Sequence, residues 1–273
     1  MDEGGVMEKF ACIGTGMMGN AIVSGIVRNG IIPAENIVLS NATFSKAEAL
    51  AKKIGASAVA SNIEAVKDAD IILLAVKPQF LGDVLTEIKG SIDPNALILS
   101  VIAGVPIERY QNELDHEYII RVMPNTPARI GQGMCAWYAT DSVTERQKEI
   151  TIQILSALGE QSEVKRESML EVVTAVSGSG PAYVYLFMEA MMDAAVLMGM
   201  PRPEAEKYVL QTVIGSAEYL KASGAHPAVL RNEVTSPAGT TAEALAVMER
   251  EGLRSAVSDG MRACLERAKA LGK

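Results

Sequence analysis

A glycine-rich turn close to the N-terminus constrains the fold of this chain more than any other feature. A short apolar segment ends at Ile13, Gly14, Gly16 and Gly19 follow in the pattern G-x-G-x-x-G, and a helical pattern continues to about residue 29. A strand, such a turn and a helix form the start of a βαβ unit that binds dinucleotides. The first Gly permits the tight turn, the second lets the backbone approach a pyrophosphate, and the third allows helix and strand to pack closely.

Short apolar runs alternate with helical patterns over the rest of the first half. We expect strands at 36–40, 69–76, 96–101, 118–122 and 159–164, and one or more edge strands within 131–140. Helices are expected at 45–53, 79–89, 106–113 and 144–158. Near-continuous apolar strands that alternate with helices indicate a parallel sheet covered on both faces. The first half therefore predicts an α/β Rossmann dinucleotide-binding domain.

The pattern changes after residue 165, where strand signals end. Helices are expected at 168–176, 179–198, 202–222, 226–233, 238–250 and 252–270, separated by Gly and Pro residues. The sequence therefore predicts two domains, a dinucleotide-binding domain at 1–165 and an all-α domain at 166–273, which we expect to dimerise.

The dimer is predicted from one unusually apolar helix. Residues 183–200 contain only Glu189 and Asp193 as charged side chains. The two acids, a Gly stop and Pro201 favour a buried helix over a membrane span. A helix that is apolar on nearly all sides has to be buried on nearly all sides, and a small helical domain covers it most readily by pairing with a second copy. A monomer that buries this helix against its own neighbours is the alternative.

Charge and composition exclude several classes of partner. The chain has 25 Lys and Arg against 33 Asp and Glu, a formal charge of −8, which argues against nucleic acid and anionic membranes. Residues 1–6 are acidic and Gly-rich, so we expect no signal peptide, and Met7 is an alternative start. No metal site or disulfide is expected, and a cytoplasmic location fits best, because His and Cys are few and scattered: His116, His226, Cys12, Cys135 and Cys264.

The end of the second strand bears on the choice of cofactor. An Asp or Glu there would bind the ribose of NAD, but the segment from Ser40 to Lys46 has no carboxylate. Its polar side chains favour NADPH, and NADH stays open. Thr43 or Ser45 is also expected to cap the next helix. Lys77, after the 69–76 strand, is expected to be a phosphate partner or a solvated cap.

Three further segments identify a family. The segments 121–128 (RVMPNTPA), 177–183 (SGSGPAY) and 233–241 (EVTSPAGTT), together with the glycine turn and the 75–78 segment (AVKP), resemble the pyrroline-5-carboxylate reductases. The resemblance extends from Lys9 to Ala268. It implies NAD(P)H-dependent reduction of 1-pyrroline-5-carboxylate to L-proline, the final step of proline biosynthesis. It also implies a Rossmann domain followed by a dimerising helical domain, with dimers that assemble into decamers.

The motif and the resemblance together imply a set of site residues. Asn125 is expected near the nicotinamide and the substrate, and the 236–241 segment is expected to receive the substrate from the partner subunit. One departure is visible, since the family often has Gly where this chain has Ala238. The expected cofactor contacts are Ile13, Gly14, Thr15, Gly16, Met17, Met18, Gly19, Ser40, Asn41, Asn62, Ala75, Val76, Lys77, Pro78, Ala103 and Gly104, and the expected substrate contacts are Ser236, Gly239, Thr240, Thr241 and Asn125.

The implied reaction does not need a strongly acidic side chain. An imine nitrogen is basic enough to be protonated near neutral pH, so a hydroxyl such as that of Thr241 suffices as the catalytic donor. We expect Ser236 to cap the following helix, whose N-terminus then binds the substrate carboxylate. A β-hydroxyacid dehydrogenase would need a Lys in the helix that follows a second Gly-rich turn, which here is the SGSG segment at 177–180. Residues 180–187 at the start of that helix contain no Lys. A reductase of another imine, such as a larger ring, and a non-catalytic NADP-sensing protein remain alternatives.

Overall fold

The computed structural model describes residues 8–271, and these fall into two compact units. Among the described residues, unit 1 comprises 8–179 and 264–271, and unit 2 is Gly180–Ala263. The expectations about residues 1–6 and Met7 lie outside the described residues.

Unit 1 is built on a sheet of eight strands within residues 8–271. The strand order is β3-β2-β1-β4-β5-β6-β7-β8, and neighbours are parallel except for β6 and β7. The chain adds strands toward one edge of the sheet from β1 to β3 and toward the other edge from β4 onward. Open α/β sheets bind ligands at the switch point between two such halves, which here lies between β1 and β4. The strands are β1 (Phe10–Ile13), β2 (Ile37–Ser40), β3 (Ser57–Val59), β4 (Ile71–Leu74), β5 (Leu97–Ser100), β6 (Ile119–Met123), β7 (Gly133–Ala139) and β8 (Gly159–Glu163).

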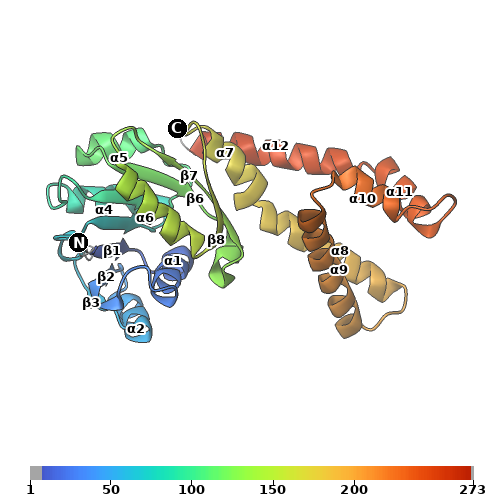
Figure 1. Ribbon diagram of the computed structural model, residues 1–273, viewed down its shortest axis with the longest axis horizontal. Helices are drawn as coiled ribbons and strands as arrows, with labels where there is room; N and C mark the ends of the chain where they lie inside the picture. Colours follow the sequence, from blue (N-terminus) through green and yellow to red (C-terminus); the bar gives the residue numbers. More distant parts are fainter. Residues whose placement is uncertain (1–7, 272–273) are drawn as a thin grey trace, which may run out of the picture. The chain divides into compact units, whose positions relative to one another are not determined.

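Helices cover both faces of this sheet (Figure 1). Side chains alternate along each strand, so Phe10 and Cys12 join one core cluster while Ala11 and Ile13 join the other. This two-sided burial explains why the central strands are apolar throughout. One face packs against α1 (Met17–Arg28), α2 (Phe44–Ile54) and α6 (Glu145–Ser156), and the other against α3 (Asn62–Val66), α4 (Leu81–Ile88) and α5 (Ile107–Leu114).

The predicted α/β Rossmann domain is confirmed, with two omissions. Sequence analysis did not predict β3 or α3, which have three and five residues. Elements this short do not complete enough periods to give a hydrophobic pattern. The strand predicted within 131–140 is β7, but it is not an edge strand, because it pairs with β6 antiparallel on one side and with β8 in parallel on the other. The edges of the sheet are β3 and β8.

Unit 1 continues past its last strand. Arg121 on β6 binds Glu167 at 2.7 Å and Glu171 at 3.0 Å, and α7 (Met169–Val173) leads into a π-helical turn, Thr174–Gly178. The domain boundary at residue 165 stays a prediction.

Unit 2 is helical, as the sequence predicts. It holds α8 (Gly180–Leu197), α9 (Arg202–Ser223), α10 (Pro227–Glu233), α11 (Thr240–Arg250) and the first part of α12 (Leu253–Leu271). The helices α8 and α9 pack against each other, and Arg202 binds Asp193 at 2.7 Å. His226 caps α10, because its Nδ1 accepts the backbone N–H of Ala228 at 3.2 Å.

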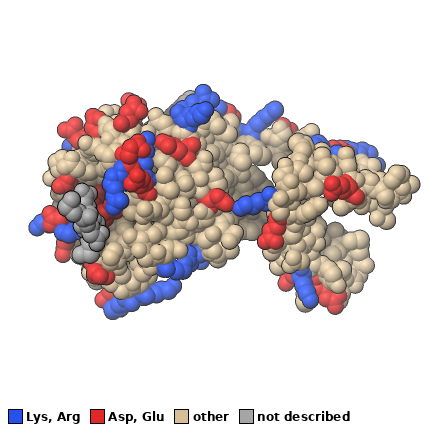
Figure 2. Space-filling model, viewed as in Figure 1, with Lys and Arg blue, Asp and Glu red and all other residues tan. Residues whose placement is uncertain are grey.

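The apolar helix α8 is only partly covered within the single chain. As described over 180–197, it has no buried side chain, and just past its end Met198 is 82% exposed. The visible face of unit 2 is correspondingly poor in charged side chains (Figure 2). Within the part of the chain that the structure describes, no helix has the length and apolar character needed to cross a bilayer.

Candidate active site

The glycine turn between β1 and α1 has the geometry that a phosphate-binding loop requires. Gly14 has φ +100°, and a Cβ there would lie 2.6 Å from the carbonyl oxygen of Ala75. A Cβ on Gly19 would overlap the carbonyl oxygen of Gly14. A Cβ on Gly16, in contrast, would have no described atom within 4 Å. Close packing therefore requires glycine at 14 and 19, and open space above Gly16 leaves room for a pyrophosphate.

Thr15 in this loop has an unused buried hydroxyl. The residue is 8% exposed, and its Oγ1 has no hydrogen-bond partner among the described residues. A buried hydroxyl without a partner costs about 1–3 kcal/mol. A phosphate oxygen at the start of α1 would accept this hydroxyl and meet the positive end of the helix dipole. The loop therefore fits a dinucleotide.

The predicted residue Asn41 supports the loop from the end of β2. Its Oδ1 accepts the backbone N–H of Thr15 at 3.1 Å, and its Nδ2 donates to the carbonyl of Thr43 at 3.1 Å. Thr43 occupies the N-cap position of α2, but its side chain makes no capping bond, and Ser45 lies inside the helix. The expected side-chain cap by Thr43 or Ser45 is therefore wrong, because the Asn41 amide holds this turn instead.

A cavity of about 590 Å³ lies over the carboxyl ends of β1, β2 and β4. Lys46 and Lys77 bring positive charge to its wall, and no carboxylate follows β2. Eight predicted cofactor contacts line it: Ile13, Gly14, Gly16, Asn41, Asn62, Ala75, Val76 and Lys77.

The cavity also has lining residues that sequence analysis missed. Phe80, Asp83, Val84 and Glu87 come from the segment that contains α4. Their spacing of three and four residues is that of one helix face, which is the signal that was available. It was not decisive, because the same spacing also describes a solvated helix face.

Some predicted cofactor contacts lie away from this cavity. Ser40 is fully buried, and its hydroxyl donates to Asn62 Oδ1 at 2.7 Å. Met17 is 73% exposed beside the loop. Met18 and Gly19 lie in α1 behind the loop, where Gly19 is buried.

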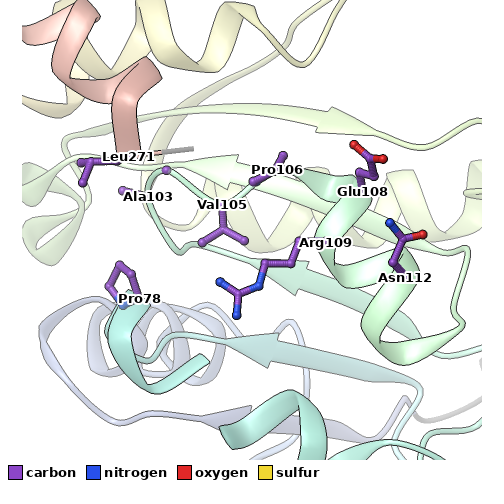
Figure 3. A pocket seen from close by; sticks show the side chains of 9 residues that line it. Pro78, Ala103, Val105, Pro106, Glu108, Arg109, Asn112 and Leu271 are labelled. Atoms are coloured by element: carbon purple, nitrogen blue, oxygen red, sulfur yellow. The ribbon is translucent and has the colours of Figure 1, made fainter. Parts of the chain in front are cut away.

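Pro78, Ala103 and Gly104 line a second cavity of about 370 Å³, between the loops that follow β4 and β5. Pro78 lies on one side of it and Val105 and Arg109 on the other (Figure 3). Gly104 has φ +75°, and a Cβ on it would lie 2.9 Å from the Cβ of Leu271. In a Rossmann fold the loops after these two strands border the nicotinamide half of the cofactor crevice.

Asn125 joins the end of β6 to the π-helical turn. Its Nδ2 donates to the Ser177 hydroxyl at 3.2 Å, and its Oδ1 accepts the backbone N–H of Met134 at 2.9 Å. Gly178 packs directly against the Met123 side chain, with no room for a Cβ. The contacts of Ser177 and Gly178 hold the SGSG segment against the loop that carries Asn125. Single π-turns within helices are frequent at functional sites.

The predicted substrate loop 236–241 belongs to unit 2. Ser236 does not cap a helix as expected, because α11 begins at Thr240 with Gly239 at the N-cap position. Instead Ser236 opens a tight turn in which its carbonyl accepts the N–H of Gly239 at 3.0 Å. Ala238 in this turn has φ +56°. The N–H groups of the first turn of α11 point out of the helix start and lack intrahelical acceptors, which suits a carboxylate.

Two cysteines beside the site are inert. Burial raises the pKa of the Cys12 and Cys135 thiols to about 12, so neither forms a thiolate near neutral pH. Among residues 8–271, no three His, Cys, Asp or Glu side chains gather where they would hold a metal ion.

The parallel sheet, the glycine turn and the cavity above it define a dinucleotide-binding α/β protein. Comparisons with family models agree with this class: residues 9–104 match the model described as NADP oxidoreductase, coenzyme F420-dependent, and residues 167–271 match the model described as pyrroline-5-carboxylate reductase dimerisation.

The most similar proteins narrow the class to one family. Pyrroline-5-carboxylate reductase of Escherichia coli is 41% identical over 267 residues, covering 97% of this chain and 99% of the relative. The NADP-bound crystal structure of the Plasmodium falciparum enzyme is 33% identical with a TM-score of 0.89, over 97% of this chain and 98% of that one. The Coxiella burnetii structure is also 33% identical, with a TM-score of 0.90, over 98% and 100%. This chain belongs to the pyrroline-5-carboxylate reductase family.

Proposed function

We propose that this chain reduces 1-pyrroline-5-carboxylate to L-proline with NADPH, as the final step of proline biosynthesis. The observation that carries the proposal is the presence of both parts of such a site in a chain that is related to the family over its whole length. Those parts are the dinucleotide cavity over the glycine turn, whose Thr15 has an unused hydroxyl, and the 236–241 loop at the start of α11. The same cavity would also take NADH as a second cofactor.

The residues around the cavity would hold the cofactor, which supplies a hydride for the imine carbon. The backbone of the 14–19 turn and the hydroxyl of Thr15 bind the pyrophosphate. The 75–78 segment and the 103–104 loop border the nicotinamide side. Asn125, with its amide already fixed by Ser177 and Met134, keeps the loop after β6 in place beside the reacting groups.

The 236–241 loop would bind and orient the substrate. The N–H groups at the start of α11 and the Ser236 hydroxyl bind the carboxylate, while the Thr241 hydroxyl donates to the imine nitrogen and holds its proton. Fixing the imine carbon against the nicotinamide in a site that excludes water supplies most of the rate gain. No stronger acid is needed, since the iminium is accessible near neutral pH.

The exposed apolar helices support a proposal for the quaternary arrangement. Leu186 and Leu197 of α8 are 67% and 89% exposed in the single chain, which a second copy of unit 2 would cover. We therefore propose a homodimer in which each protomer supplies its 236–241 loop to the other's cofactor site, with further assembly into decamers. A helical domain at 166–273 and a cytoplasmic location complete the proposal.

Kinetics with single variants test the site. Ser236→Ala should mainly raise KM for pyrroline-5-carboxylate, and Thr241→Ala should lower kcat/KM at least about tenfold, which is about 1.4 kcal/mol. Ser142→Ala, at an exposed hydroxyl of unit 1 that binds Glu117, is the matched control.

Three outcomes would count against the proposal in different ways. Unchanged kinetics in both variants would remove the substrate loop from the site. Tight NADPH binding without turnover by the wild type would favour a sensor of NADP. Faster turnover of a six-membered cyclic imine would identify that larger ring as the preferred substrate. Light scattering measures the oligomeric state separately.

A further inference from the structure

Glu87 reaches the wall of the cofactor cavity from α4 and binds one residue there twice. Its Oε1 accepts the backbone N–H of Asn62 at 3.0 Å, and its Oε2 accepts the side-chain Nδ2 of Asn62 at 2.7 Å. Both residues line the cavity. A carboxylate that accepts two N–H groups fixes both the position and the rotation of the amide it holds.

This contact also sets the direction of a chain of hydrogen bonds. An ionised carboxylate can only accept, so Asn62 must turn Nδ2 toward Glu87 and Oδ1 toward Ser40. The Ser40 hydroxyl then donates to Oδ1 at 2.7 Å. Because Ser40 is fully buried, Asn62 and Glu87 are the members of this hydrogen-bond chain that line the cavity.

Glu87 also places negative charge in a cavity suited to an anionic ligand. The charged side chains that line the cavity are Lys46 and Lys77 on one hand and Asp83 and Glu87 on the other. A 2′-phosphate adds between one and two negative charges to the dinucleotide, by analogy with a phosphorylated side chain. Glu87 therefore opposes NADPH more than NADH, although the Asn62 contact that it stabilises serves both cofactors.

We propose that Glu87 is a specificity-determining residue: it positions Asn62 for the adenosine half of the cofactor, and its charge limits the preference for NADPH over NADH. This inference rests on the proposed function, since it assumes that the cavity binds a nicotinamide dinucleotide. Glu87 is then a positioning residue, which acts on the cofactor through its hydrogen bonds to Asn62 and through the electrostatic field of its carboxylate.

The test is a binding titration of the full chain with each cofactor in the absence of substrate. Nicotinamide fluorescence is the signal that reports binding. For Glu87→Gln, the ratio of the NADH Kd to the NADPH Kd should rise about threefold at low ionic strength, because a unit negative charge is removed from the wall of the cavity that would hold the 2′-phosphate. The rise should shrink in high salt, where the field is screened. Both Kd values should increase, since Gln cannot accept both N–H groups of Asn62.

The control is Glu64→Gln, which makes the same charge change on α3 at an exposed residue outside the cavity lining. Its ratio should stay at the wild-type value. An unchanged ratio in Glu87→Gln would overturn the inference even if both cofactors bound more weakly, because Glu87 would then be structural only. If the wild type bound neither cofactor, the proposed function itself would fail.

Discussion

The carbonyl oxygen of Ala75 occupies the space that a side chain at Gly14 would need. A Cβ at Gly14 would stand 2.6 Å from that oxygen, and Gly14 has φ +100°. The loop that follows β4 therefore packs directly against the phosphate-binding turn. Ala75 and Gly14 both line the cofactor cavity, so two of its walls are in contact there.

Gly14→Ala should therefore destabilise the chain and abolish cofactor binding. The left-handed backbone and the clash with a main-chain atom each cost about 1–2 kcal/mol or more. Gly90→Ala is the control, since Gly90 has φ +76° but no described atom within 4 Å of a Cβ. Urea unfolding at fixed protein concentration measures both, and equal losses would show that the contact with Ala75 has no energetic weight.

Gly16→Ala should leave stability nearly unchanged and weaken NADPH binding at least about tenfold, or 1.4 kcal/mol. The methyl group meets open space in the free protein but fills the path by which the pyrophosphate approaches the backbone. Thermal unfolding and a fluorescence titration separate these two effects. Wild-type affinity for NADPH would contradict the assignment of the phosphate site.

Arg121→Met should destabilise the chain by about 3 kcal/mol or more, because it leaves two carboxylates without their buried partner. The Arg121 side chain is 6% exposed, and Glu167 also accepts the N–H of Ile107 at 2.9 Å. The exposed pair between Arg109 and Glu113 gives the control, as Arg109→Met should cost less than about 0.5 kcal/mol. Similar losses in urea unfolding would disprove the difference.

Ala238→Gly should stabilise the chain by about 0.5–1 kcal/mol, since it relieves a non-glycine residue at φ +56°. Ala244→Gly, at an exposed site inside α11, should have the opposite effect, a loss of about 1 kcal/mol. Differential scanning calorimetry compares the two. A destabilised Ala238→Gly variant would mean that the Ala238 methyl group makes a contact that outweighs its strain.

Stability should fall in a Tyr110-dependent way at alkaline pH. Burial raises the pKa of Tyr110 from 10.0 to about 12, so the folded state retains a proton that the unfolded state loses. This contribution is complete below about pH 10 and is lost as pH rises through 12. The difference in unfolding free energy between the wild type and Tyr110→Phe should therefore shrink from pH 10 to pH 12, and a constant difference would contradict the shift.

The sequence by itself determined the local elements and the class of fold. Period-two alternation between two cores made the strands apolar throughout, and the spacing of Gly14, Gly16 and Gly19 defined the turn. Gly199 and Gly224 end α8 and α9 near the predicted positions because their positive φ values suit glycine. These features are encoded by neighbours in the chain, so they can be read from it.

Only the tertiary structure decided which residues far apart in the sequence meet in and around the site. Glu87 binds Asn62 across 25 positions, Arg121 binds Glu167 across 46, and Ser40 turns away from the cavity to join Asn62. These partners meet because parallel strands bring their carboxyl ends to one edge of the sheet in the order 3-2-1-4-5-6. Strand order and helix rotation depend on packing of the whole core, and no local pattern carries that information.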